Sequence, residues 1–295
     1  MNGIINFLKP PGMSSNGAVG FFKKTLNYKK IGHAGTLDPG ACGVLVILVG
    51  KATKLSDRLM AGTKEYIGQI TFGATTDTQD SYGQVMKTDD KVVSHDELTR
   101  ILPEFLGEID QTPSKYSAIK VNGRKAYDLA RAGKDFTLKS RIVTIEHLKV
   151  LHHIEKNRFL IKVRCSKGTY IRALFEDIGK RLNTCAYTSF LERSRSGQFD
   201  VANSVTADEA KAMVENSSID HMLIPMDTVL HDLKRIDVFK SDYKKISNGV
   251  PARIESIIDD KREGEYKVYC NDVFFGIGEI IDDDKVKITT HLFGE

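Results

Sequence analysis

The stretch that decides the fold spans residues 32–49 and reads Gly32-His33-Ala34-Gly35-Thr36-Leu37-Asp38-Pro39-Gly40-Ala41-Cys42-Gly43, then Val44-Leu45-Val46-Ile47-Leu48-Val49. Its apolar second half is typical of a buried strand. Its glycine-rich first half contains one carboxylate, Asp38, and one imidazole, His33. Pro39 favours an extended backbone at Asp38, and the glycines permit angles that other residues avoid, so the loop can hold this carboxylate in a fixed orientation. The same pattern is also an ordinary turn signal, which leaves both interpretations open.

Length and cysteine usage restrict the class of protein. A chain of 295 residues exceeds the usual single domain, which predicts one large domain and a smaller one. Its four cysteines form no Cys-x-x-Cys pair, so they are interpreted as reduced thiols of a cytoplasmic protein. The amino-terminal residues lack a signal-peptide pattern, and no apolar run is long enough to span a bilayer. We therefore expect neither secretion nor a membrane partner.

Charge is distributed unevenly along the chain. The net charge is only +4, but residues 111–141 carry eight basic and two acidic side chains, a balance of +6. Residues 158–195 carry nine basic and three acidic side chains, again +6. In contrast, residues 255–287 contain ten acidic and five basic side chains. Two basic regions within the first two thirds of the chain are typical of a protein that binds a polyanion.

Strand and helix signals alternate along the first two hundred residues without a βα repeat. The pattern predicts strands over residues 3–8, 44–49, 64–72, 158–166 and 185–191, and helices over residues 15–26, 51–61, 94–105 and 170–182. Capping boxes at Ser94 to Glu97 and at Thr206 to Glu209 mark two helix starts. This mixture favours an α+β fold around a mixed or antiparallel sheet, with flanking helices.

The character of the chain changes near residue 231. Helix signals fade, and short strand candidates occur at residues 266–270, 273–275 and 286–290 between glycine and acidic turns. We therefore predict two domains, residues 1–230 and a small β-rich domain of residues 231–295.

Several motifs stand in a characteristic order between about Gly3 and Phe199. They are Lys9-Pro10-Pro11-Gly12-Met13-Ser14-Ser15-Asn16, residues 32–45, Lys64-Glu65-Tyr66, Thr76-Asp77-Thr78-Gln79-Asp80 with Gly83, a group from Gln111 to Lys120 that includes Ala118, Ser166-Lys167-Gly168-Thr169-Tyr170-Ile171-Arg172, and Leu191-Glu192-Arg193 with Gly197 and Phe199. In this order the chain resembles the TruB family, the tRNA pseudouridine-55 synthases. The resemblance implies the pseudouridine synthase fold, an inserted tRNA-gripping segment at about residues 107–141, and a PUA-like RNA-binding domain at the carboxyl end.

The resemblance also implies a reaction. Such an isomerase breaks the bond between uracil N1 and ribose C1′ of uridine 55, rotates the base and rejoins it through C5, without a cofactor or a metal. Asp38 would be the catalytic carboxylate, either as nucleophile or as base. Arg172 would supply the opposite charge that a carboxylate beneath a base needs to stay ionised. Tyr66 would stack on the target base and accept a proton.

Other positions are assigned to substrate binding by the same resemblance. Tyr170 and Leu191 would form walls of the uracil pocket, and His33 would help to extrude the target nucleotide, since a base inside a folded loop must be flipped out. Basic side chains would hold the phosphates of the T stem-loop. These are Lys120, Arg124 and Lys125 of the inserted segment. Lys9 of the first motif is also assigned to substrate binding. We expect a monomer that needs no protein partner.

Two other functions fit parts of the pattern. An RNA-binding module or tRNA folding chaperone would use the same basic surfaces, but it would not need a carboxylate in an RNA-facing cleft. A carboxylate-based hydrolase of nucleosides would need a second acid near Asp38, for which Asp77 and Asp80 are the candidates.

Overall fold

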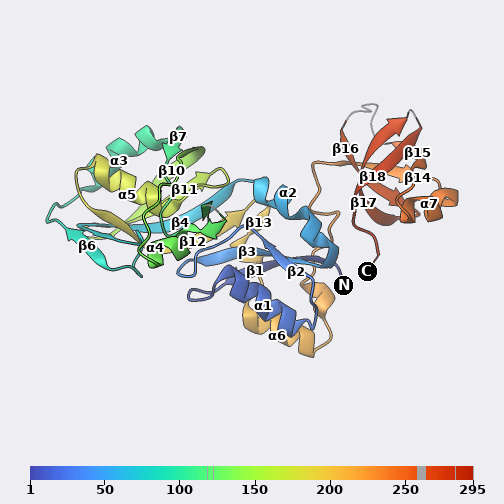
Figure 1. Ribbon diagram of the computed structural model, residues 1–295, viewed down its shortest axis with the longest axis horizontal. Helices are drawn as coiled ribbons and strands as arrows, with labels where there is room; N and C mark the ends of the chain where they lie inside the picture. Colours follow the sequence, from blue (N-terminus) through green and yellow to red (C-terminus); the bar gives the residue numbers. More distant parts are fainter. Residues whose placement is uncertain (118, 122, 258–263, 283, 295) are drawn as a thin grey trace.

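The computed structural model describes residues 1–117, 119–121, 123–257, 264–282 and 284–294, and its centre is a nine-stranded sheet (Figure 1). The main strand order is β1-β3-β12-β4-β11-β10-β7, with β2 paired to β3 and β13 paired to β12. The strands are β1 (Gly3–Lys9), β2 (Ile31–Ala34), β3 (Cys42–Val49), β4 (Lys64–Phe72), β7 (Gly107–Gln111), β10 (Arg141–Glu155), β11 (Arg158–Cys165), β12 (Ala186–Ser196) and β13 (Phe199–Asp200). Strand β12 runs parallel to β3 and antiparallel to β4, so the sheet is mixed and the α+β fold class is confirmed.

Helices cover the sheet in two groups. They are α1 (Ser15–Thr25), α2 (Ser56–Ala61), α3 (His95–Ile101), α5 (Ile171–Arg181) and α6 (Ala207–Glu215), with 3-10 turns η1 (Gly50–Leu55), η2 (Leu102–Phe105), η3 (Val201–Asn203) and η4 (Ile219–His221). Helices α3 and α5 pack over β10, β11 and β4, whereas α1 and α6 lie side by side against β1 and β3 (Figure 1). Both predicted capping boxes form, at Ser94 and Thr206. No helix within the described ranges has the length and apolarity to cross a membrane.

Some elements were not predicted. His33 lies in β2 and not in a loop, and the helix expected over residues 51–61 begins as the 3-10 turn η1. The loop after residue 72 contains a hairpin of β5 (Ala74–Thr76) and β6 (Val85–Thr88), and β7 and the long strand β10 were also missed. Bulges at three places along β10 explain the last omission, because each one shifts the alternation of buried and exposed residues on which strand prediction depends.

A closed barrel forms the carboxyl-terminal part of the molecule. Its order is β14-β15-β18-β17-β16, from β14 (Lys234–Val238), β15 (Ala252–Ile257), β16 (Glu265–Cys270), β17 (Val273–Asp282) and β18 (Lys285–His291), with η5 (Lys240–Asp242) and α7 (Tyr243–Ser247) between β14 and β15. The three strands expected in this region lie within β16, β17 and β18, whereas β14 and β15 were missed. The barrel packs against the end of η1 through an apolar cluster that includes Leu55, Ile277 and Leu292.

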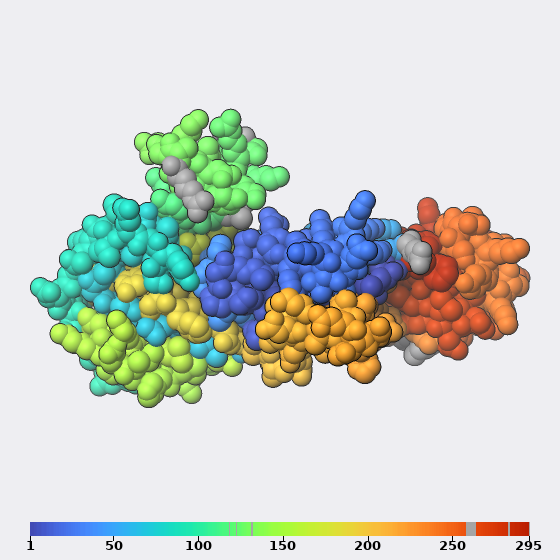
Figure 2. All heavy atoms as spheres, turned by 90° about the horizontal axis from the view of Figure 1, so that it is seen from below, coloured from blue at the N-terminus to red at the C-terminus, as the bar shows by residue number. Residues whose placement is uncertain are grey.

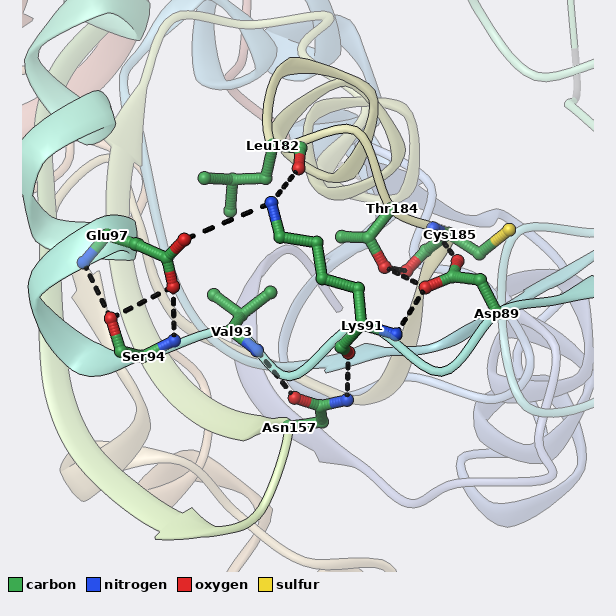
Figure 3. Close-up of polar contacts among 9 residues, drawn as sticks. All are labelled: Asp89, Lys91, Val93, Ser94, Glu97, Asn157, Leu182, Thr184 and Cys185. Carbon is green, nitrogen blue, oxygen red and sulfur yellow. Dashed lines mark hydrogen bonds and ion pairs between the residues drawn. The ribbon is translucent and has the colours of Figure 1, made fainter.

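The segment that leaves β6 is fixed by polar contacts (Figure 3). The Asp89 carboxylate accepts hydrogen bonds from the Cys185 amide at 2.6 Å, the Thr184 hydroxyl at 2.7 Å and the Lys91 amide at 3.1 Å. Asn157 in the β10–β11 turn donates to the Lys91 carbonyl at 2.8 Å. Partial burial alone would raise the pKa of Asp89, but these hydrogen bonds lower it to about 2. The contacts join the segment to the end of α5 and to the β10–β11 turn.

Candidate active site

The centre of the site is a close pair of opposite charges. Asp38 lies in the loop between β2 and β3, and Arg172 lies in the first turn of α5. Arg172 Nε is 2.8 Å from Asp38 Oδ2, and the side chains are 5% and 36% exposed, respectively. A buried guanidinium thus meets a carboxylate that remains open to solvent. The geometry brings together the two residues that the sequence analysis paired.

Arg172 also joins two further segments to the Asp38 loop. Its Nη1 donates to the Thr78 carbonyl at 2.6 Å, and its Nη2 donates to the Tyr116 carbonyl at 3.1 Å. Asp80 lies 3.5 Å from the same guanidinium and accepts a hydrogen bond from the Thr78 hydroxyl at 2.6 Å. The second carboxylate near Asp38 is therefore held by partners of its own, and it shapes the cleft around Arg172.

Three cavities meet at Asp38 and Arg172, with volumes of about 620, 580 and 160 Å³. Tyr66, Tyr170 and Leu191 line the largest one. His33 and Lys125 line the second, on the other side of Asp38. The volume of the largest cavity lies in the range of small-molecule sites, and its walls combine aromatic, apolar and charged groups. One carboxylate thus borders two cavities that are each lined by both aromatic and basic side chains.

Two tyrosines enter the largest cavity from different elements. Tyr66 projects from β4; burial raises the pKa of its phenol, and the neighbouring Arg193 guanidinium acts in the opposite direction. Tyr170 lies directly before α5, and its backbone exchanges two hydrogen bonds with the Gln111 amide group, at 2.8 and 3.0 Å. The Arg141 guanidinium lies 4.7 Å from the centre of the Tyr170 ring, a cation–π contact. The backbone and the ring of Tyr170 are therefore both held by neighbouring side chains.

His33 and Lys9 occupy positions that the sequence alone could not specify. Burial lowers the pKa of the His33 imidazole, which favours its neutral form. Lys9 is fully buried, and its ammonium donates to the carbonyls of Pro10, Met13 and Pro39 at 2.8, 2.7 and 3.3 Å. Burial lowers the pKa of Lys9 to about 8. Lys9 therefore contacts the backbone next to Asp38, in the protein interior.

The inserted segment forms a protrusion beside the site (Figure 2). It contains the hairpin of β8 (Lys120–Val121) and β9 (Arg124–Lys125), followed by α4 (Ala126–Arg131). Lys120 and Arg124 are exposed, whereas Lys125 donates to the Tyr127 hydroxyl at 3.1 Å and lines the second cavity. Ala118 of the motif lies outside the described residues. The hairpin thus carries two exposed cations beside Lys125, which lines the second cavity.

Sequence reasoning assigned no role to Arg193 or Lys64. Both side chains are buried next to the largest cavity, and burial lowers the pKa of Lys64 to about 8. Arg193 belongs to the motif Leu191-Glu192-Arg193, and Lys64 belongs to the motif Lys64-Glu65-Tyr66. Their proximity in sequence to Leu191 and Tyr66 was the one feature that could have indicated a role for them. Within the described part of the chain, no group of three or more His, Cys, Asp or Glu side chains is arranged to hold a metal ion.

Two family models match the chain. "TruB family pseudouridylate synthase (N terminal domain)" matches residues 23–171, and "tRNA pseudouridylate synthase B C-terminal domain" matches residues 172–231. The chain is 42% identical over 292 residues to the tRNA pseudouridine synthase B of Clostridioides difficile (strain 630), and the match covers 95% of each protein. It is 39% identical over 300 residues to the protein of the same name from Alkaliphilus oremlandii (strain OhILAs), covering 99% of each.

Solved structures share the fold. A chain in an H/ACA RNP bound to a substrate RNA containing 2′-deoxyuridine superposes with a TM-score of 0.72 at 25% identity, covering 99% of this chain and 85% of that one. A chain in a Cbf5-Nop10-Gar1 complex superposes with a TM-score of 0.69 at 27% identity, covering 98% and 79%, respectively. The likeness extends over both the nine-stranded sheet and the barrel.

Proposed function

Because the chain belongs to the TruB family of pseudouridylate synthases, we propose that it isomerises uridine 55 in the T loop of tRNA to pseudouridine. It is an isomerase that acts on RNA, and its curated relatives are tRNA pseudouridine synthases. The observation that carries the proposal is the Asp38–Arg172 pair, 2.8 Å apart, where two cavities lined by aromatic and basic side chains meet.

The largest cavity would receive the uracil ring. Tyr66 and Tyr170 offer aromatic surfaces for the base, and Leu191 offers an apolar one. The Asp38 carboxylate would then start cleavage of the bond between N1 and C1′, either by attack on the nucleoside or as a base. Arg172 would keep the carboxylate charged and oriented during this step. After rotation of the base, C5 bonds to C1′, and Tyr66 would take the proton that C5 loses.

The second cavity would admit the RNA. Removing a base from a folded loop costs roughly a few kcal/mol, which new contacts in the protein must offset. His33, held neutral by burial, and Lys125 line the cavity next to Asp38. Lys120 and Arg124 on the protruding hairpin would bind phosphates, since positively charged side chains position a nucleic acid through its backbone. Lys9 would support this arrangement from beneath, through the Pro39 carbonyl.

The remaining assignments complete the proposal. The protein would act as a monomer in the cytoplasm, with tRNA as its partner and no protein partner. Its barrel would serve as a PUA-like module that extends RNA contact beyond the catalytic domain, and the two domains would comprise residues 1–230 and 231–295. The small, closed barrel of five strands supports this assignment.

The test is site-resolved pseudouridine formation in an unmodified T-arm hairpin, at equal amounts of bound RNA. The wild type should convert position 55, whereas Asp38→Asn should bind the hairpin and form no product, because the amide keeps the shape of the carboxylate and removes its charge. Asp208→Asn is the charge-matched control, since Asp208 is exposed in α6, and it should convert the hairpin like the wild type.

Each other outcome has a distinct meaning. Product from Asp38→Asn at a comparable rate would refute the role of Asp38. Tight binding without product from either protein would favour an RNA folding chaperone. Release of free uracil would indicate a hydrolase, with Asp80 as the second acid.

A further inference from the structure

Arg193 lies beneath the Asp38 loop and is 1% exposed. Its guanidinium donates three hydrogen bonds to backbone carbonyls: Nε to Val44 at 2.8 Å, Nη1 to Thr36 at 3.1 Å and Nη2 to Gly35 at 3.2 Å. These carbonyls lie on both sides of Asp38 in the sequence. One planar side chain therefore clamps the two ends of the loop that carries the carboxylate.

The register of the sheet places Arg193 between the two reactive groups. Strand β12 lies between β3 and β4, and Arg193 pairs with Gly43 on β3 and with Tyr66 on β4. Residues directly opposite each other in an antiparallel pair place their side chains on the same face of the sheet, and both side chains line the largest cavity. Arg193 thus holds the Asp38 loop and lies beside Tyr66.

A bulge separates Arg193 from the next arginine of the strand. The register between β12 and β4 shifts by a bulge between Arg193 and Arg195. Arg195 is at the surface, where its guanidinium lies 2.7 Å from the Asp200 carboxylate. Bulges often re-aim side chains next to active sites. Arg193 is buried and Arg195, two positions later, is exposed. Substitution of Arg195 is therefore a matched control for substitution of Arg193.

The positive charge of Arg193 is directed at neutral groups. Among the residues that the structure describes, no carboxylate forms an ion pair with Arg193. Its hydrogen bonds go to backbone carbonyl oxygens, and its neighbour across the strand pair is Tyr66. A buried guanidinium without a carboxylate partner favours negative charge on a neighbouring phenol.

We propose that Arg193 is a positioning residue for the second half of the isomerisation, in which it holds the Asp38 loop and the Tyr66 phenol in register and stabilises the phenolate that takes the C5 proton. The inference rests on the proposed function. In this step the C5–H bond breaks and its electron pair becomes the C5–C6 double bond. The electrons of the N1–C6 double bond move to N1, which takes up a proton from water, while the C5 proton passes to the Tyr66 phenolate and gives the neutral phenol.

The groups around Tyr66 determine the expected pH dependence. Arg193 faces it from β12, Cys165 from β11 and Asp38 from the loop. Burial raises the pKa of Tyr66, the thiol and the carboxylate raise it further, and Arg193 lowers it. Loss of the guanidinium should therefore raise this pKa, so that a higher pH is needed to form the phenolate.

The experiment compares wild type, Arg193→Met, Arg193→Lys and Arg195→Met on hairpins with hydrogen or deuterium at C5 of the target uridine. For Arg193→Met we expect kcat to fall about 100-fold with KM changed less than about threefold, as for loss of support to a general base. The deuterium isotope effect on kcat should increase, and the rising limb of the pH–rate profile should move to higher pH. Arg195→Met should match the wild type in all three readouts.

Arg193→Lys separates charge from geometry. An ammonium keeps the charge but cannot reproduce the planar fork that reaches three carbonyls. We expect a smaller loss of kcat, a raised isotope effect and an unmoved pH profile. This variant also decides the case if Arg193→Met does not fold.

An isotope effect equal to that of the wild type in every soluble Arg193 variant would overturn the inference, since any loss of kcat would then reflect general disorder of the loop. A wild type that makes no pseudouridine would overturn the proposed function instead. The two failures are therefore distinguishable.

Discussion

At the scale of single residues, buried cations surround the Asp38 loop. Lys9, Lys64, Arg172 and Arg193 are each at most 6% exposed. Burying a charge is costly unless it is well hydrogen-bonded, and here backbone carbonyls of irregular segments supply most of the acceptors. Because a glycine-rich loop has few side chains with which to fix itself, Lys9, Arg172 and Arg193 take over that task.

A substitution at Gly43 can test how closely the Asp38 loop fits against the sheet. Its φ is +106°, and a Cβ atom at this position would lie 2.4 Å from the Arg193 carbonyl oxygen. We expect Gly43→Ala to lower the free energy of unfolding by about 2 kcal/mol or more, because it combines a disfavoured backbone conformation with a clash against backbone. Urea denaturation measures this change.

Gly20→Ala is the matched control for this substitution. Gly20 is exposed in α1, and a Cβ atom there would meet nothing within 4 Å. Alanine should stabilise the helix by up to about 1 kcal/mol. Equal stability of the two variants would show that the loop adapts to a side chain at residue 43.

The sequence could predict site residues, but it could not predict all of their surroundings. Asp38, Tyr66, Tyr170, Arg172 and Leu191 line one cavity, although their catalytic roles stay predictions. The burial of Lys9 was beyond sequence reasoning. A lysine is usually exposed, and this one is accommodated only because carbonyls from separate segments converge on it.

At the scale of elements, the accuracy of prediction followed the regularity of the hydrogen bonding. Strands β1 and β3 pair in continuous register, and α3 and α6 have capping boxes, so their local sequences were sufficient. Strand β10 is interrupted by bulges, and β2 is only four residues long. The β8–β9 hairpin is shorter still, so its pairing carries no periodic signal.

The cluster around Asp89 should contribute to acid stability. The pKa of Asp89 in the folded protein, about 2, lies below its ordinary value of 3.8, so its stabilising contribution is complete above about pH 4 and is lost as the pH falls from 4 towards 2. Asp89→Asn should lower the free energy of unfolding at pH 7 by about 1–2 kcal/mol, since an amide NH₂ group would face a donor. Between pH 4 and 2, the variant should lose less stability than the wild type.

Denaturation at pH 7, 4 and 2.5 provides the measurement. Asp90→Asn changes the next, exposed carboxylate and should behave like the wild type at all three pH values. If Asp89→Asn follows the wild-type curve through this range, the hydrogen bonds of Asp89 do not set its acid stability.

At the scale of the whole molecule, the barrel is attached through charges as well as apolar contacts. Arg58 in α2 lies 2.8 Å from Asp232 and 2.5 Å from Glu265, while Lys54 donates to the His291 carbonyl at 2.9 Å. The sequence analysis expected two domains, but their contact joins residues 174 and 207 positions apart. No local pattern predicts such a pairing.

Loss of Arg58 should weaken this attachment. We expect Arg58→Met to lower the unfolding temperature of the barrel by about 4–8 °C, which corresponds to about 1 kcal/mol for two partly exposed ion pairs in a small domain. The difference from the wild type should shrink in 1 M salt, which screens such pairs. Scanning calorimetry measures both effects.

Arg181→Met is the control for loss of a surface arginine. Arg181 pairs with Glu104 at 2.6 Å and lies away from the barrel. Its loss should therefore not separate the unfolding transition of the barrel from that of the large sheet. If the barrel and the large sheet of Arg58→Met unfold together at the wild-type temperature, apolar contacts alone attach the barrel.

The order of strands in the large sheet also determines when the site can exist. Strands β3 and β4 lie on either side of β12, yet β12 is synthesised more than a hundred residues after β4. Closing so long a loop is entropically costly and slow. Until residue 196 has left the ribosome, the growing chain can form only two separate half-sheets with unpaired edges. Maturation of the enzyme therefore ends with the insertion of the strand that carries Leu191 and Arg193, and nascent chains that stop before it are inactive and prone to aggregate.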